Sequence, residues 1–194
     1  MKIHFIRVAF LIVMAFPVSS FAQEEMESLD EIRSETALEH VGDVAQFAPA
    51  ALSVFAILIH NDKEGAWQFV KSVGANLAAT YIIKYAINKK RPNGAPDGHA
   101  FPSGHTSAAF QGASFVQKRY GWEYGIPAYV VAGFVGYSRV EGLNDRHDWY
   151  DVIAGAVVGI GSSYLFTTPY LQDHYKLTFN SGNGDFLIGI NYKF

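Results

Sequence analysis

The chain has 194 residues, a formal net charge of −3 and no cysteine. The slightly acidic balance, with no basic stripe, argues against a nucleic-acid partner, and the absence of cysteine excludes disulfides and a thiol nucleophile. The length is that of one domain with one sizeable hydrophobic core.

Residues 1–22 are predicted to be a signal peptide. Lys2 and Arg7 form a basic leader, residues 8–16 are apolar, and Ser20 and Ala22 offer small side chains at the positions that a cleavage site requires. Because the apolar run is too short to span a bilayer comfortably, we expect export and cleavage. An uncleaved membrane anchor is the alternative.

Residues 23–43 are polar and acidic, and we assign this N-terminal segment no catalytic role. Residues 44–171 are predicted to form a helical domain, because apolar side chains recur at helical spacing between proline-rich or polar turns. The expected helices cover residues 44–60, 66–90, 105–120, 124–140 and 147–168. The predicted fold class is therefore all-α, an antiparallel bundle of about five core helices.

The last segment, residues 172–194, is predicted to form a short C-terminal β-hairpin. Apolar side chains alternate with others along its second half, at Phe186, Ile188, Ile190, Tyr192 and Phe194, and residues 181–184 carry turn signals. A single hairpin is only marginally stable. We therefore expect it to dock on the bundle or to pair with a partner.

A Ser-Gly-His step, Ser103-Gly104-His105, stands at a predicted loop-to-helix junction. Prolines and glycines precede it, and small helix-compatible residues follow. A helix N-terminus carries unsatisfied N–H groups and a partial positive charge, so this junction suits an anion. Taken alone, the step is equally compatible with Ser103 acting only as a helix cap.

Counting along antiparallel helices brings further charged residues to the same end of the bundle. Lys84 and Arg91 close the second predicted helix, Arg139 closes the fourth, and His147 opens the fifth. Lys84 and Arg91 are seven residues apart and would share a face if the helix reached that far. The alternative for these two is a solvated basic helix end, and residues 89–90 are interpreted as surface charge.

These residue types suit phosphoryl transfer without a metal. His147 could attack phosphorus as a nucleophile, and Asp151, one helical turn later, could fix the tautomer of its ring. His105 could act as the general acid. The alternatives are a chance His–Asp pair at a helix start and a His105 that only binds an anion. No grouping has the spacing of a metal site, so we expect neither a metal nor a cofactor.

The combined motifs resemble the three-part signature of the type 2 phosphatidic acid phosphatase and vanadium haloperoxidase superfamily. They are Lys84-(six residues)-Arg91-Pro92, Phe-Pro-Ser-Gly-His-Thr, and Ser138-Arg139 followed by His147-(three residues)-Asp151. The resemblance covers roughly residues 84–159. Seven residues rather than the usual five separate Arg139 from His147. The resemblance implies catalytic roles for His147, His105 and Asp151, and phosphate binding by Lys84, Arg91, Ser103, Gly104 and Arg139.

The resemblance implies a metal-independent phosphatase that hydrolyses a phosphomonoester or pyrophosphate, an envelope lipid phosphate in our interpretation, through a phosphohistidine intermediate. A soluble periplasmic non-specific acid phosphatase, a vanadate-dependent haloperoxidase and a non-catalytic phosphate-binding protein remain as alternatives.

Location follows from the polar residues inside the predicted helices, which are Gln68, Lys71, Asn76, Gln111 and Gln117. Polar and charged side chains are costly at mid-bilayer depth. We therefore expect a periplasmic domain that is soluble or attached to the membrane surface. An integral inner-membrane bundle with a periplasm-facing site is the alternative.

Overall fold

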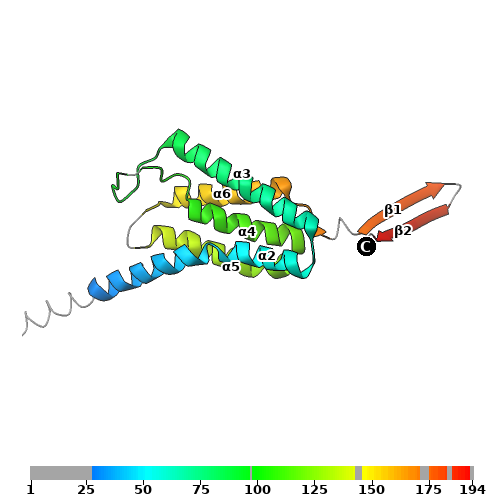
Figure 1. Cartoon of the computed structure of the whole chain (residues 1–194), viewed down its shortest axis with the longest axis horizontal. Helices are drawn as coiled ribbons and strands as arrows, with labels where there is room; N and C mark the ends of the chain where they lie inside the picture. The colour runs from blue at the N-terminus through cyan, green and yellow to red at the C-terminus, as the bar shows by residue number, and fades with distance from the viewer. Residues whose placement is uncertain (1–27, 97, 143–145, 171–174, 183–184, 193–194) are drawn as a thin grey trace, which may run out of the picture.

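The computed structural model describes residues 28–96, 98–142, 146–170, 175–182 and 185–192, so the predicted signal peptide lies outside the described residues. A first helix covers residues 28–45. It is followed by α2 (Ala48–Ile59), α3 (Lys63–Ile87), α4 (Gly104–Tyr120), α5 (Trp122–Val140) and α6 (Trp149–Phe166). The prediction of a helical bundle is confirmed (Figure 1).

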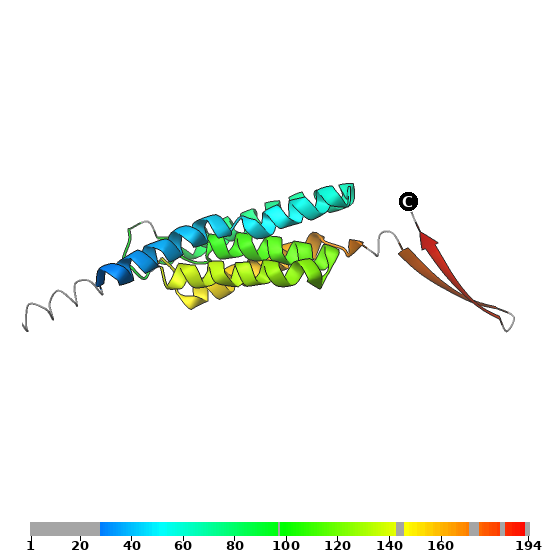
Figure 2. The same cartoon turned by 90° about the horizontal axis from the view of Figure 1, so that it is seen from below.

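Helix α4 lies at the centre of the bundle and packs against α2, α3, α5 and α6 (Figures 1 and 2). Small side chains such as Ala109 and Ala113 are fully buried on it. Helix α6 approaches so closely that a Cβ on Gly159 would overlap Ser107 O and lie 2.8 Å from Gln111 N. Glycine on α6 therefore sets the distance between these two helices.

Several helix ends differ from the prediction, among them the start of α2 at Ala48 instead of residue 44, and two of the differences concern the candidate site. Asn88 adopts the left-handed conformation and ends α3 at Ile87, so the helix does not reach Arg91 and the condition for a face shared with Lys84 is not met. Helix α6 begins at Trp149, because Asp148 caps it through a reciprocal capping box with Asp151. His147 therefore precedes the helix instead of opening it.

A stripe of polar side chains on α3 faces the interior of the bundle, spaced four residues apart at Gln68, Ser72, Asn76 and Thr80. Helix α4 supplies partners for this stripe. Gln111 Nε2 donates to Ser72 Oγ at 2.8 Å, and the Ser107 hydroxyl donates to Asn76 Oδ1. The polar groups are thus satisfied by contacts between helices, as buried polar groups require.

The end of the bundle opposite the Ser-Gly-His step is closed by a buried ion pair. Arg119 Nε lies 2.7 Å from Asp62 Oδ2, and both side chains are almost fully buried. The Tyr120 hydroxyl donates to the same carboxylate at 2.8 Å, and Arg119 Nη1 donates to Thr168 O at 2.9 Å. These contacts join the α2–α3 turn to the ends of α4 and α6.

The outer faces of the helices are apolar. Large exposed hydrophobic side chains include Phe55, Leu58, Ile59, Trp67, Val70, Ile82, Ile126, Val130, Ile153, Val157 and Leu165. Two helical segments, Ser28–Ile59 and Trp149–Phe166, are long and apolar enough to cross a membrane. The bilayer cost predicted for Gln68, Asn76 and Gln111 does not arise, because these amides are buried between helices.

Strand β1 (Tyr175–Gly182) pairs antiparallel with β2 (Asp185–Tyr192), with Tyr175 opposite Tyr192. Both views show the two strands extending beyond the helices (Figures 1 and 2). The residues that join them, 183–184, lie outside the described residues. The predicted hairpin and its docking therefore stay predictions.

Candidate active site

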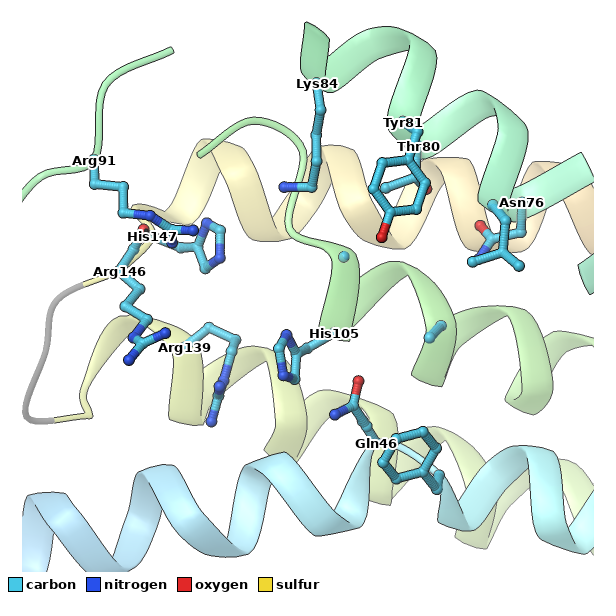
Figure 3. Close-up of a pocket in the computed structure, with 14 residues that line it drawn as sticks. Gln46, Asn76, Thr80, Tyr81, Lys84, Arg91, His105, Arg139, Arg146 and His147 are labelled. Carbon is cyan, nitrogen blue, oxygen red and sulfur yellow. Dashed lines mark hydrogen bonds between the residues drawn. The ribbon is translucent and has the colours of Figure 1, made fainter. Parts of the chain in front are cut away.

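A cavity of about 390 Å³ lies at the end of the bundle that holds the Ser-Gly-His step (Figure 3). Six of the eight predicted site residues line it, namely Lys84, Arg91, Gly104, His105, Arg139 and His147. Its other lining residues are Gln46, Phe47, Asn76, Leu77, Thr80, Tyr81, Ala108 and Arg146. The cavity is therefore cationic where the loops meet and more apolar along α3.

His147 reaches the cavity from the segment just before α6 (Figure 3). Its Nδ1 lies 3.5 Å from Asp151 Oδ2 and, within the described part of the chain, makes no hydrogen bond. Burial, together with the positive charges of Lys84 and Arg91, lowers the pKa of His147 to about 3. The imidazole is therefore neutral near pH 7, which is the form that can act as a nucleophile.

Asp151 does not line the cavity but lies behind His147, fully buried. Lys89 Nζ donates to Asp151 Oδ1 at 2.7 Å and also to the Asp148 carboxylate. The interpretation of Lys89 as surface charge is therefore wrong. The sequence does not indicate the contact between Lys89 and Asp151, because these residues are 62 positions apart and no local pattern distinguishes Lys89 from its neighbour Lys90.

Lys84 and Arg91 come to the cavity from different elements. Lys84 lies in the last turn of α3, and its Nζ donates to His99 O at 2.8 Å. Arg91 lies in the following loop, where Nη1 donates to Arg146 O at 3.3 Å. In Figure 3 both side chains point towards the space in front of His147.

The Ser-Gly-His step begins α4, as predicted, but its three residues differ in position. Gly104 and His105 line the cavity. Ser103 is fully buried and accepts a hydrogen bond from Thr106 Oγ1 at 3.0 Å, while its backbone N–H donates to Asp151 O at 2.9 Å. The Ser103 hydroxyl therefore lies outside the cavity lining, and Ser103 stands at the N-cap position of α4 without a capping hydrogen bond from its side chain.

Two acidic residues of the first helix approach the site and were not predicted. Asp43 Oδ1 lies 2.6 Å from Arg139 Nη1 and 3.2 Å from His105 Nε2. The backbone oxygen of Glu39 accepts a hydrogen bond from Arg139 Nη2 at 2.8 Å, and the Glu39 carboxylate lies 3.1 Å from Arg146 Nε. The acidic character of residues 23–43 was the only sequence signal.

Comparison with known proteins identifies related chains. Residues 65–174 match the family model of the PAP2 superfamily. The lipid A 4′-phosphatase of Helicobacter pylori is 29% identical over 150 residues, which cover 72% of this chain and 74% of that protein. The lipid A 1-phosphatase of Porphyromonas gingivalis is 42% identical over 81 residues, or 40% of this chain and 17% of that protein.

Two solved structures share the fold. The crystal structure of Aquifex aeolicus LpxE aligns with a TM-score of 0.54 at 21% identity, covering 71% of this chain and 92% of that one. A transmembrane PAP2-type phosphatidylglycerolphosphate phosphatase from Bacillus subtilis aligns with a TM-score of 0.52 at 22% identity, covering 76% and 84%.

Proposed function

Because the chain belongs to the PAP2 superfamily, and is thereby a phosphatase, we propose that it removes phosphate from a membrane lipid, with lipid A as the first candidate. One observation carries this substrate class. The cationic end of the cavity continues into a part lined by Phe47, Leu77 and Tyr81. A phosphate joined to an apolar body would contact both parts.

The proposed reaction has two steps. The Nε2 of His147 forms a bond to phosphorus while the ester P–O bond breaks, and His105 donates a proton to the departing oxygen. Water then attacks the phosphohistidine, His105 accepts its proton, and the P–N bond breaks. Asp151, 3.5 Å from His147 Nδ1, stabilises the imidazolium character that develops in the first step.

The negative charge of the phosphoryl group needs compensation throughout both steps. Lys84, Arg91 and Arg139 provide three cations at the cavity, and the N-terminus of α4 at Gly104 adds its partial positive charge. Arg91 can offer two parallel N–H groups to phosphate oxygens, whereas Lys84 acts as a point charge. This is the complement expected of a site that binds phosphate without a metal.

We also propose that the bundle is embedded in the membrane, which is the alternative to the expected periplasmic, soluble form. The apolar exterior, the hydrogen-bonded polar interior and the two candidate spans support this arrangement. In lipid, polar groups must find partners inside the protein, as the α3 stripe does. Lys71 is exposed on α3, and its Nζ lies 5.2 Å from the centroid of the Trp67 ring, a cation–aromatic pairing that suits the membrane interface.

The test is a substrate panel on the purified full-length chain in detergent, with EDTA present. Bisphosphorylated lipid A, phosphatidic acid, phosphatidylglycerol phosphate and a water-soluble aryl phosphate are compared by phosphate release. Mass spectrometry then identifies which phosphate of lipid A is lost. Preference for a lipid supports the proposal, whereas turnover of the aryl phosphate alone would contradict it.

Membrane embedding is tested by fractionation. Protein recovered only after detergent extraction of washed membranes supports it. Release by osmotic shock or by alkaline carbonate would contradict the proposal and indicate a soluble or peripherally attached protein.

A further inference from the structure

Asp43 joins two predicted site residues that come from different helices. Its Oδ1 is 2.6 Å from Arg139 Nη1 on α5 and 3.2 Å from His105 Nε2 on α4. Asp43 belongs to the first helix, before the stretch that matches the family model, 65–174. From this geometry we propose that Asp43 is a positioning residue. It holds the general acid, His105, and a phosphate-binding cation, Arg139, in fixed positions relative to each other.

The carboxylate approaches from behind the site rather than from the cavity. His105 and Arg139 both line the cavity, whereas Asp43 is not among the described residues that do. In Figure 3 the Arg139 side chain extends towards the first helix, away from Lys84. Asp43 therefore does not occupy the place of the phosphate, and it constrains Arg139 and His105 while leaving the cavity open.

The first helix lies very close to the end of α5. A Cβ on Gly42 would overlap Ser138 Oγ and lie 2.7 Å from Arg139 Nη2, so no larger residue fits without moving the helix. The same close approach brings Glu39 O to 2.8 Å from Arg139 Nη2. Close packing at Gly42 is an observation independent of the Asp43 ion pairs, and it fixes the same two elements against each other.

The chemical consequence concerns the orientation of His105. A carboxylate on one ring nitrogen selects the tautomer and stabilises the protonated ring, which leaves the other nitrogen for the leaving oxygen. An imidazole that rotates freely would meet that oxygen less often. This inference rests on the proposed function, because it assigns His105 the role of the acid.

The experiment compares Asp43→Asn, Asp43→Glu and Gly42→Ala in the full-length protein, with Asp30→Asn as the matched control. Asp30 lies on the same helix and, among the described residues, forms an exposed ion pair with Arg33 at 3.6 Å. General acid catalysis contributes about 10²–10⁴-fold. We therefore expect kcat to fall about tenfold or more in Asp43→Asn and Gly42→Ala, with a smaller change in KM.

Asp43→Glu should recover most of the lost kcat, because it restores the charge, and the control should match wild type. Equal kcat in wild type and Asp43→Asn would overturn the proposal, as would a loss that appears only in KM. Binding of inorganic phosphate, followed by calorimetry, separates this inference from the proposed function. If wild type hydrolysed none of the lipids, the proposed function would fail, and unchanged phosphate affinity in Asp43→Asn would then overturn the role of Asp43.

Discussion

Lys89 and Asp151 form an ion pair of 2.7 Å directly behind the His147 imidazole, with the Asp151 carboxylate fully buried. Partial burial opposes protonation of Lys89, but hydrogen bonds to Asp148 and Asp151 outweigh it and raise the pKa of the ammonium group. The pair therefore ties the loop after α3 to the start of α6. It also supplies the counter-charge without which a buried carboxylate is costly.

We predict that Lys89→Gln weakens both the fold and the reaction. A hydrogen bond to a charged group is worth about 1.5–3 kcal/mol, and this change removes charge from two such bonds. Thermal unfolding in detergent should show a lower Tm, and kcat should fall about tenfold because Asp151 loses its fixed position. Lys90→Gln is the control, since Lys90 is the exposed neighbour. A Lys89→Gln protein as stable and active as the control would contradict the pair's role.

His147→Gln is expected to reduce turnover by at least about 10³-fold while the protein still folds, because the nucleophile is lost and the charge is unchanged near pH 7. Acid-labile, alkali-stable labelling by a radioactive phosphate donor should disappear with it. His40→Gln, which changes an exposed histidine of the first helix, should keep both activity and label. Residual rates within a few-fold of wild type would remove His147 from the nucleophile role.

The pH dependence of folding tests the environment of His147 without any substrate. Its pKa is about 3 in the folded protein, against an ordinary value of 6.5. Between these values the unfolded chain binds a proton that the folded chain does not. Stability should therefore fall as the pH decreases from about 6.5, at up to about 1.4 kcal/mol per pH unit, and level off near pH 3.

His147→Gln cannot take up that proton, so its Tm should fall less than that of wild type between pH 7 and pH 4. Both proteins share every other titrating group, which makes the difference between the two slopes the quantity to measure. Parallel curves would show that His147 titrates normally in the folded state.

Arg91→Gln and Lys84→Gln are predicted to weaken competitive inhibition by vanadate about 10- to 100-fold each, since each change removes a charge-assisted contact to the anion. The apparent affinity for substrate should weaken in parallel. Lys90→Gln provides a control of equal charge change on an exposed side chain. An inhibition constant equal to wild type in either variant would assign that residue to surface charge.

Helix packing can be tested with two glycines on α6. A Cβ on Gly159 would overlap Ser107 O, whereas one on Gly161 meets nothing within 4 Å. Gly159→Ala should therefore destabilise the protein by about 1–3 kcal/mol, as overpacking does. Gly161→Ala should stabilise it by up to about 1 kcal/mol through helix propensity. Equal Tm shifts for the two variants would refute the close approach of α4 and α6.

The sequence was sufficient for the existence of the five core helices and for the meeting of their ends, because breaker residues or polar turns separate the helices and antiparallel order brings alternate ends together. It did not indicate the break at residues 46–47, between the first helix and α2. It was insufficient at Asn88. An Asn followed by two lysines carries no glycine or proline signal, so the sequence pattern predicts a helix that continues to Lys90. In the structure the helix ends before Asn88, which adopts the left-handed conformation. The supposed common face of Lys84 and Arg91 depended on that extension.

Local sequence patterns do not predict contacts between residues that are far apart in the chain. Asp43 and Arg139 are 96 positions apart, and nothing in either neighbourhood specifies the other. The expected location depended on polar residues counted along each helix, and such a count does not say which face of the helix a polar residue occupies. The four-residue spacing from Gln68 to Thr80 was present in the sequence and places these side chains on one face of α3, which the structure turns inward.

The filled interior of the bundle has a consequence for the fate of the products. Between the cavity and the far end, the space beside α3 is occupied by the hydrogen-bonded side chains of Ser72, Asn76, Ser107 and Gln111, and the far end is closed by Arg119 and Asp62. Within the described residues these side chains fill the route along α3, so the proposed substrate and its products would enter and leave at the loop end of the bundle. A dephosphorylated lipid would leave in the leaflet from which it came, and the freed phosphate would stay in the compartment that the headgroup faced. Hydrolysis by the proposed membrane phosphatase would therefore release both products without moving either across the bilayer.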